Sequence, residues 1–335
     1  MASKKLKSIQ DVARIAGVSK STVSRALNNS SLVKSETREA IQAIAKAHEF
    51  RPSATARNLS LRASRIIGFV NDAYSKGTCQ VSCPFSLEIM GGIAIGLHEL
   101  GYDLLVIHVD PHDSDWAAQY LDTGRVDGFI LMTESGKRSQ VDLLVSRSAP
   151  FIAWGASSGN YCTVCGEDRM GGRLACERLL SRGRRRIGFI GGPRAEPEVR
   201  GRLLGYRDAL KAAGKSFEPR LVAYADYSER SGARAMEELL ERQPDLDAVF
   251  SNSDVMAIAA MGVLKARGRR IPDDVAIVGY DDLSLASYVT PALTTVSQKV
   301  PLAGTLLARD LVAFLKQGIV THTVVPVELV ARDSA

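Results

Sequence analysis

The sequence predicts an α/β protein with a small all-α N-terminal headpiece and a core of two lobes, each a parallel sheet flanked by helices. Three observations lead to this prediction. Residues 8–28 hold two short helical patterns that meet at a glycine. After residue 65, short apolar runs alternate with helical stretches, as in sheets of parallel strands with crossover helices. Segments of this second part also recur 120 residues further along the chain.

The composition indicates a protein of more than one domain with an uneven charge. Of 335 residues, 45% are hydrophobic and 24% charged, which is ordinary for globular proteins. Residues 1–65 hold 13 Lys or Arg and 4 Asp or Glu, a net +9, whereas the remainder nets −3. A basic end on a mildly acidic body indicates a polyanionic partner for that end. The alternative is a solvated basic tail, but such a tail would lack the apolar periodicity that this region shows.

Neither a membrane span nor a signal peptide is predicted. No apolar run reaches the ~18 residues that a spanning helix needs. The basic start MASKKLK is not followed by an apolar stretch, as a signal peptide would require. We therefore expect a cytoplasmic protein with no membrane partner.

The stretch SIQDVARIAGVSKSTVSRALN at residues 8–28 predicts a helix-turn-helix. Ser8 can cap the first helix, with Asp11 at its third position. Gly17 should end that helix, because glycine accepts the left-handed backbone of a tight turn. Ser19 can cap the second helix, which turns Val23 toward the first. In this arrangement the second helix is the one that enters a major groove of DNA.

The exposed face of the second helix carries side chains that can form hydrogen bonds with DNA. These are Lys20, Ser21, Thr22, Ser24 and Arg25. The first turn would meet base edges, and the planar guanidinium of Arg25 can donate two hydrogen bonds to guanine. A solvated helical hairpin is the alternative interpretation, and the concentration of positive charge favours DNA binding.

A third helix and a linker complete the N-terminal region. The third helix should begin at Ser35, with an inner face formed by Ala40, Ile41, Ile44 and Ala45. In RPSATARNLSLRAS at residues 51–64, Pro52 can take the first position of a short helix. So short a helix is marginal alone in water. We expect a hinge that orders only against DNA and a second copy of the chain.

Eight strand-like runs follow residue 65, separated by helical stretches. They are IIGFV, YDLLVIHV, GFILMT, PFIAW, RRIGFIGG, LVAYAD, AVFSN and VAIVGYDD. Residues 65–70 are echoed by 185–190, and residues 126–130 by 246–250. Two copies of one α/β unit explain these echoes. Two facing lobes create a cleft at the carboxyl ends of their strands, where ligands bind in open sheets.

No pattern for catalysis, a cofactor or a metal stands out. The glycines of IGFIGGPR lack the G-x-G-x-x-G spacing of a dinucleotide loop, and G-x-S-x-G and H-E-x-x-H are absent. The five histidines are scattered, so we expect no catalytic residues and no enzyme. Zinc or redox chemistry at the Cys79/Cys83 and Cys162/Cys165 pairs is an alternative, but we expect reduced, partly buried thiols.

Residues 8–60 resemble the headpiece and hinge of the lactose-repressor (LacI/GalR) family, through IQDVARIAGVSKSTVSRALN and TREAIQAIAKAHEFRPSATARNL. The body resembles that family's effector-binding core, which is similar to periplasmic sugar-binding proteins, through RGRLLGYRDAL, NSDVMAIAAMGVL, IPDDVAIVGYDD and PALTTVSQ. The resemblance implies that paired hinge helices enter the minor groove, where Leu59 wedges into a base step. Ala56 matches the small residue that lets the helices approach, with Arg57 beside it on the DNA.

The resemblance also implies a set of effector contacts in the cleft. Arg202 matches an arginine that hydrogen-bonds effectors, and Asp281 matches a ligand acceptor at a strand end. The other expected contacts are Asp72, Phe85, Trp154, Tyr227, Ser253, Asp254 and Gln298. An ion pair between the lobes is the alternative for Arg202 and Asp281, and core packing is the alternative for Trp154. Acids together with aromatic faces favour a carbohydrate as the effector.

The sequence therefore predicts a homodimeric, ligand-responsive regulator of transcription, expected to repress, on a near-palindromic operator in double-stranded DNA. The rival interpretations are a sugar-binding transport protein, which should have no headpiece, and an enzyme that uses the cleft. The expected crossings between lobes lie near residues 165, 295 and 326. The expected domains are the headpiece 1–50, the hinge 51–64, a first lobe 65–164 plus 296–325, and a second lobe 165–295 plus 326–335.

Overall fold

The computed structural model describes most of the chain, in two compact units, Met1–Ser64 and Arg65–Ala335. The described residues are 6, 8–50, 63–72, 83–110, 113–132, 138–155 and 159–335, with no side chains described at 71–72 and 138–139. The predicted hinge residues Ala56, Arg57 and Leu59 lie outside them. Within these ranges, no helix is both long and apolar enough to cross a membrane.

The headpiece folds into the three helices that the sequence predicts, α1 (Ile9–Ala16), α2 (Lys20–Leu27) and α3 (Ser35–Ala47). Ser8 caps α1 by accepting a hydrogen bond from the backbone N–H of Asp11 at 3.2 Å. Gly17 ends α1 in the left-handed conformation, at φ 64°. Ser19 caps α2 by accepting from the N–H of Thr22 at 3.1 Å. The predicted capping and turn residues are thus confirmed.

A small apolar cluster holds the three helices together. It consists of Val12, Ala13, Val23, Ala26, Val33, Ile41, Ala45 and Phe50. The prediction for α3 was wrong at Ala40, which is exposed. Successive helical residues are turned by roughly 100°, so a face centred on Ile41 and Ala45 carries Ala40 toward solvent.

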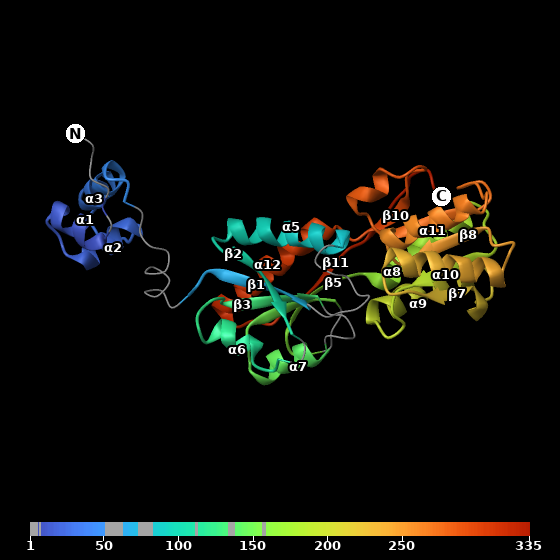
Figure 1. The fold of residues 1–335 in the computed structure, drawn as a ribbon, viewed down its shortest axis with the longest axis horizontal. Coiled ribbons are helices and arrows are strands. Elements are labelled where there is room, and N and C mark those ends of the chain that lie inside the picture. Colours follow the sequence, from blue (N-terminus) through green and yellow to red (C-terminus); the bar gives the residue numbers. More distant parts are fainter. Residues whose placement is uncertain are drawn as a thin grey trace. The chain divides into compact units, whose positions relative to one another are not determined.

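The first sheet has the strand order β11-β5-β4-β3-β1-β2, and all its pairs are parallel. Its strands are β1 (Ile66–Asp72), β2 (Asp103–Val109), β3 (Gly128–Met132), β4 (Phe151–Trp154), β5 (Cys162–Gly166) and β11 (His322–Val325). Helices α5 (Pro84–Glu99) and α12 (Val300–Gln317) cover one face, and α6 (Trp116–Leu121) and α7 (Arg138–Ser146) the other (Figure 1). We call this sheet with its helices the first lobe.

The second sheet has the order β12-β10-β9-β8-β6-β7, with β12 antiparallel to β10. Its strands are β6 (Ile187–Gly191), β7 (Val222–Tyr224), β8 (Ala248–Ser251), β9 (Ala276–Asp281), β10 (Thr294–Ser297) and β12 (Glu328–Val330). Helices α8 (Asp168–Ser181) and α9 (Pro197–Ala212) cover one face, and α10 (Glu229–Arg242) and α11 (Asp254–Ala266) the other. Short 3-10 helices lie at η2 (Pro219–Leu221) and η3 (Ser284–Ser287). We call this sheet with its helices the second lobe.

The two lobes repeat one another in detail, as the echoes in the sequence predict. Strands β6, β7 and β8 take the places in the second sheet that β1, β2 and β3 take in the first. The backbone N–H of Arg65 donates to Asp127 at 2.8 Å, just before β1 and β3. The N–H of Arg185 donates to Asp247 at 2.8 Å, just before β6 and β8. An aspartate at the equivalent position therefore links the two equivalent strands in each lobe.

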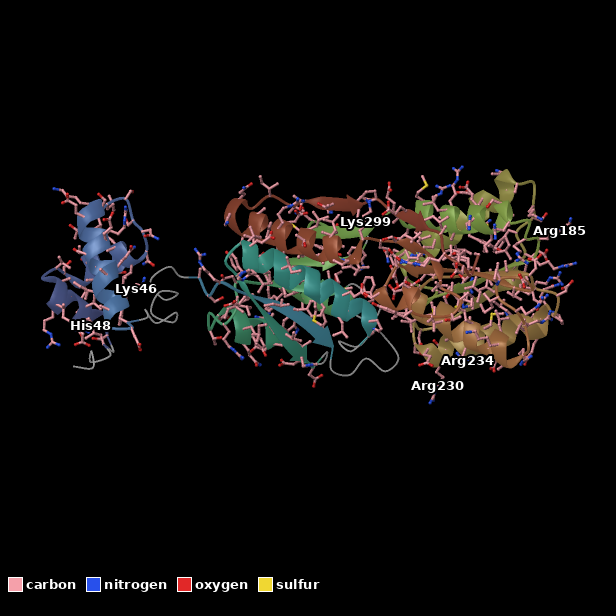
Figure 2. All side chains as sticks on the ribbon, turned by 90° about the horizontal axis from the view of Figure 1, so that it is seen from above. Lys46, His48, Arg185, Arg230, Arg234 and Lys299 are labelled. Carbon is pink, nitrogen blue, oxygen red and sulfur yellow. The ribbon has the colours of Figure 1, made fainter. Side chains whose placement is uncertain are left out.

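All eight predicted strands are present, and the sequence missed β5, β10, β11 and β12. The missed strands have 5, 4, 4 and 3 residues, too few for a clear alternating pattern. They flank the passages between the lobes, at residue 167, at Gln298 and Lys299, and at residues 326 and 327. Figure 2 labels Lys299 at one of these passages, where its ammonium lies 3.7 Å from Glu328. The predicted residue boundaries of the lobes stay a prediction.

The expectation of reduced thiols is confirmed for Cys162, Cys165 and Cys176 and is wrong for Cys83. Cys83 is disulfide-bonded, which corrects the prediction, while Cys79 lies outside the described residues. A disulfide needs a second cysteine within bonding distance in the folded chain, and sequence spacing alone does not show which cysteines come that close. Cys162 and Cys165 are free and stand three residues apart on β5, so their side chains leave opposite faces of the sheet and cannot share a metal or a disulfide. The described ranges hold no cluster of metal-binding side chains.

Candidate functional site

The first candidate site is the outer face of α2 in the headpiece. Lys20, Ser21 and Arg25 are exposed, and Thr22 and Ser24 are partly exposed. The five residues predicted to face DNA thus lie on an accessible helix of a folded unit.

Contacts from α3 fix the carboxyl end of α2. The amide of Gln42 donates to the carbonyl oxygen of Ala26 at 3.2 Å and to the side-chain oxygen of Asn29 at 2.8 Å. A helix held at both ends, by its Ser19 cap and by Gln42, presents its side chains in a fixed geometry. Direct reading of base edges requires such a geometry.

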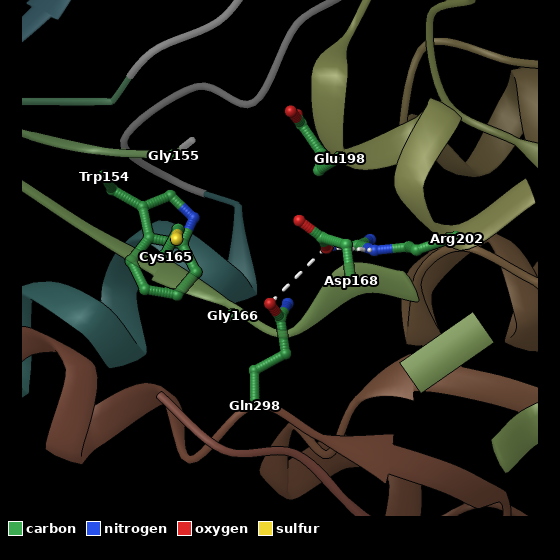
Figure 3. Close-up of a pocket in the computed structure, with 8 residues that line it drawn as sticks. All are labelled: Trp154, Gly155, Cys165, Gly166, Asp168, Glu198, Arg202 and Gln298. Carbon is green, nitrogen blue, oxygen red and sulfur yellow. Dashed lines mark hydrogen bonds and ion pairs between the residues drawn. The ribbon is translucent and has the colours of Figure 1, made fainter. Parts of the chain in front are cut away.

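The second candidate site is a pocket between the two lobes. Its lining residues are Trp154, Gly155, Cys165, Gly166, Asp168, Glu198, Arg202 and Gln298 (Figure 3). Three of them, Trp154, Arg202 and Gln298, belong to the predicted effector contacts. They come from β4, from α9 and from the passage between β10 and α12, so separate segments of both lobes converge here.

Arg202 is the centre of the polar wall of this pocket. Its side chain is buried, and its Nε donates to Asp168 at 2.9 Å. One terminal nitrogen donates to the carbonyl oxygen of Asn252 at 2.8 Å, and the other reaches the side-chain oxygen of Gln298 at 3.5 Å. The guanidinium carbon lies 3.8 Å from the ring centroid of Tyr280. Burial opposes this charge, but the carboxylate of Asp168 and other acidic neighbours raise the pKa of Arg202 above its ordinary value.

Gln298 links Arg202 to Asp281. Its side-chain N–H donates to the Asp281 carboxylate at 2.6 Å, while its oxygen faces Arg202. The alternative of an ion pair between the lobes is therefore wrong for Arg202. Its carboxylate partner is Asp168 on α8, and Arg202, Asp168 and Asp281 all belong to the second lobe.

Burial raises the pKa of two carboxyl groups of the second lobe. Burial raises the pKa of Glu198 to about 7, although the positive charge of Arg202 works against the shift. Burial likewise raises the pKa of Asp281 to about 7, again opposed by Arg202. Burial thus makes both groups easier to protonate than a carboxyl group in water.

The first lobe supplies aromatic rings at the same place. The rings of Phe85 and Trp154 lie with centroids 6.0 Å apart and planes tilted by 48°. Both are partly exposed and pack at the edge of the buried cluster under α5 and α12. Trp154 therefore packs on the core, as the alternative interpretation holds, and it also lines the pocket, while its contact with an effector stays a prediction.

Three other predicted contacts have structural roles outside the pocket. Ser253 caps α11 by accepting from the N–H of Met256 at 3.2 Å. Asp254 is fully buried and accepts from Thr295 at 2.5 Å and from the N–H of Leu283 at 2.8 Å. Tyr227 packs against the core of the second lobe.

Asp72 cannot be placed among these groups. It ends β1, but its side chain lies outside the described part of the chain.

The sequence interpretation missed five of the pocket residues, Gly155, Cys165, Gly166, Asp168 and Glu198. Glu198 stands four residues before Arg202 on α9, and residues at this spacing share one face of a helix. That signal could have identified Glu198. Asp168 follows β5, which the sequence had not revealed as a strand, so its position at a strand end stayed hidden.

Comparison with known proteins places the chain in a family. Residues 8–53 match the model for bacterial regulatory proteins of the lacI family, and residues 176–335 match a periplasmic binding protein-like domain. The transcriptional regulator CelR of Thermobifida fusca is 36% identical over 329 residues, which cover 96% of this chain and 94% of CelR. The chain belongs to the LacI family. It is thus a DNA-binding regulator of transcription and not an enzyme.

Solved structures of LacI-family proteins share the fold. A complex of CelR with cellobiose has a TM-score of 0.73 and 33% identity, covering 98% of this chain and all of the other. A lac repressor dimer bound to operator and an anti-inducer has a TM-score of 0.82 and 26% identity, covering 98% and 99% of the two chains. These likenesses confirm the predicted headpiece and two-lobed core.

Proposed function

We propose that this regulator is a cytoplasmic homodimeric repressor that binds a near-palindromic operator and responds to a small carbohydrate held between its two lobes. The observation that carries the proposal is the pocket in which Trp154 faces the network of Arg202, Asp168 and Gln298. The lobes themselves would be 65–164 plus 296–325, and 165–295 plus 326–335. The relatives named above, one bound to cellobiose and one a dimer on its operator, support it.

A carbohydrate suits this pocket for chemical reasons. The CH faces of a sugar ring pack on aromatic rings, as Phe85 and Trp154 would allow. Its hydroxyl groups need fixed donors and charged acceptors, which Arg202, Asp281 and Glu198 would provide. The remaining proposed contacts are Asp168 and Gln298.

DNA would be bound through the outer face of α2. Lys20 and Ser21 would meet base edges in the major groove, and Arg25 would hold a guanine. The hinge residues Ala56, Arg57 and Leu59 would enter the minor groove, with Leu59 kinking the central base step. Two headpieces related by two-fold symmetry require half-sites related in the same way.

The effector and the operator would be coupled through the relative position of the two lobes. Any effect of the sugar on operator affinity must be matched by an equal effect of the operator on sugar affinity. The coupling can have either sign, because it depends on which arrangement of the lobes the sugar prefers.

Electrophoretic mobility shift with the full-length chain tests the proposal, using selected operator DNA and a panel of mono- and disaccharides. We expect binding to a near-palindromic site and one sugar class that changes operator affinity by tenfold or more. Arg25→Ala should weaken cognate binding by about 1–3 kcal/mol and binding to random DNA far less. Sugar binding measured by calorimetry that leaves operator affinity unchanged would contradict the proposed coupling.

A further inference from the structure

A contact between the lobes lies beside the pocket and is not part of it. Glu88 on α5 of the first lobe accepts two hydrogen bonds from Ser284, which begins η3 in the second lobe. The backbone N–H and the hydroxyl of Ser284 both reach the same carboxylate oxygen of Glu88 at 2.8 Å. The two residues are 196 positions apart in the sequence and belong to different lobes, so this contact depends on how the lobes lie.

An apolar contact between the lobes continues from this hydrogen-bonded pair. Leu283, next to Ser284, is 1% exposed and belongs to the buried cluster of the first lobe, although it lies on the second-lobe loop after β9. Leu285 and Val255 of the second lobe pack against the same cluster. Apolar packing is not directional, whereas a carboxylate that receives two donors specifies one position. The Glu88–Ser284 pair therefore adds a directional contact to the apolar one.

The contact is also built on the same segments that carry the proposed effector residues. On α5, Phe85 precedes Glu88 by three residues, a spacing that places both on one face of the helix. On the other lobe, Asp281 precedes Ser284 by three residues at the carboxyl end of β9. A ligand held between Phe85 and Asp281 would therefore set the separation of α5 from η3.

We infer that Glu88 and Ser284 form a latch between the lobes, which stabilises their present arrangement and couples the pocket to operator affinity. The coupling part of this inference rests on the proposed function of the pocket. Two arrangements of the lobes need differ by only a few kcal/mol for one pair of hydrogen bonds to change their populations. Glu88 acts here as a positioning residue and need not touch the effector.

A double-mutant cycle tests the latch in the full-length chain. The variants are Glu88→Ala, Ser284→Ala and the double variant, with Glu99→Ala as the control. Glu99 ends the same helix and is exposed, so its loss changes the charge of α5 equally. Energy transfer between dyes at the exposed positions Asp122 and Ser216, introduced as non-natural amino acids, reports the separation of the lobes without any ligand.

The latch predicts a distinctive pattern. Glu88→Ala should shift or broaden the distance between the dyes, Ser284→Ala should do so less because its N–H remains, and the double variant should add little. The ratio of operator Kd values with and without the active sugar should fall about fivefold in Glu88→Ala. Glu88→Gln, which keeps an acceptor oxygen, should restore part of both effects, and Glu99→Ala should match the wild type.

The two readouts separate the latch from the proposed function. An unchanged distance in Glu88→Ala, or effects of the two single variants that simply add, would overturn the latch. A different result would reject only the proposed effector: no sugar changes the operator affinity of the wild type, but Glu88→Ala shifts the distance between the dyes and the effects of the two single variants do not add. The latch would then stand.

Discussion

The two lobes share a topology but bring different chemistry to the cleft between them. The first lobe presents the rings of Phe85 and Trp154. The second presents a buried ionic network of Arg202, Asp168 and, through Gln298, Asp281. Repetition of the fold therefore did not repeat the site. A ligand between such walls would be recognised by shape on one side and by hydrogen bonds on the other.

The largest expected loss of stability follows from breaking the ionic network of the second lobe. Arg202→Ala leaves Asp168, whose side chain is 12% exposed, without its cation, and removal of one partner of a buried pair costs about 3–5 kcal/mol. Chemical denaturation measures this loss. Arg169→Ala is the matched control, because its pair with Asp208 is largely exposed and such pairs contribute at most ~1 kcal/mol. Equal losses in the two variants would mean that the network does not stabilise the second lobe.

Replacing a glycine between two packed helices should lower the free energy of unfolding by a similar amount in both lobes. An added Cβ would meet the carbonyl of Pro301 at Gly92, between α5 and α12, and the carbonyl of Arg202 at Gly172, between α8 and α9. Gly92→Ala and Gly172→Ala should each lower the free energy of unfolding by about 1–3 kcal/mol, because backbone cannot yield as a side chain can. Thermal denaturation measures both.

Gly91→Ala is the control for these variants. Gly91 adjoins Gly92 on α5, and a Cβ there meets nothing within 4 Å. Because alanine is favoured over glycine in a helix by about 1 kcal/mol, Gly91→Ala should be neutral or stabilising. A loss at Gly91 as large as at Gly92 would remove close helix packing as the explanation.

Local chemistry decided how much of this structure the sequence could predict. Caps such as Ser8 and Ser19 were predictable because one side chain and its next three residues form them. The repeat was predictable because buried strands such as 66–70 and 187–190 keep their apolar residues. Both kinds of signal lie within a single stretch of sequence.

Contacts between distant segments were not predictable in this way. Asp254 was assigned to the effector, but it accepts from Thr295 and the N–H of Leu283, and no short pattern reveals partners so far away. The pairing of Arg202 with Asp168 instead of Asp281 depended on β5, which was too short to recognise. Glu88 and Ser284 are 196 residues apart, so only the folded chain reveals their contact.

The two lobes should also differ in their response to pH. Glu198 and Asp281 of the second lobe have pKa values of about 7, raised by burial from 4.5 and 3.8. Between about pH 4 and pH 7 these two groups bind more protons in the folded chain than in the unfolded chain, so they lower the free energy of unfolding as pH rises. Glu198→Gln should remove part of this decline, an effect on the order of 1 kcal/mol. Urea denaturation at several pH values measures it.

The exposed Glu99 of the first lobe provides the control for that experiment. Other acidic groups, such as Asp274 with its pKa of about 2, contribute the opposite slope in both proteins. The difference between each variant and the wild type therefore isolates one carboxyl group. A pH profile of Glu198→Gln that coincides with that of Glu99→Gln would contradict the role of burial at Glu198.

The smallest expected effect concerns Asp127 and Asp247, which occupy equivalent positions in the two lobes. Asp127 accepts from the N–H of Arg65, and Asp247 accepts from the N–H groups of Arg185 and Arg186. Asp127→Asn and Asp247→Asn keep an acceptor oxygen but lose the charge, so each should cost about 0.5–1 kcal/mol. The costs should add, because separate hydrophobic clusters underlie the two sites. Hydrogen exchange should show faster opening of β1 and β3 in the first variant and of β6 and β8 in the second. If either variant opened both sheets equally, the lobes would be one cooperative unit and not two copies of a self-supporting one.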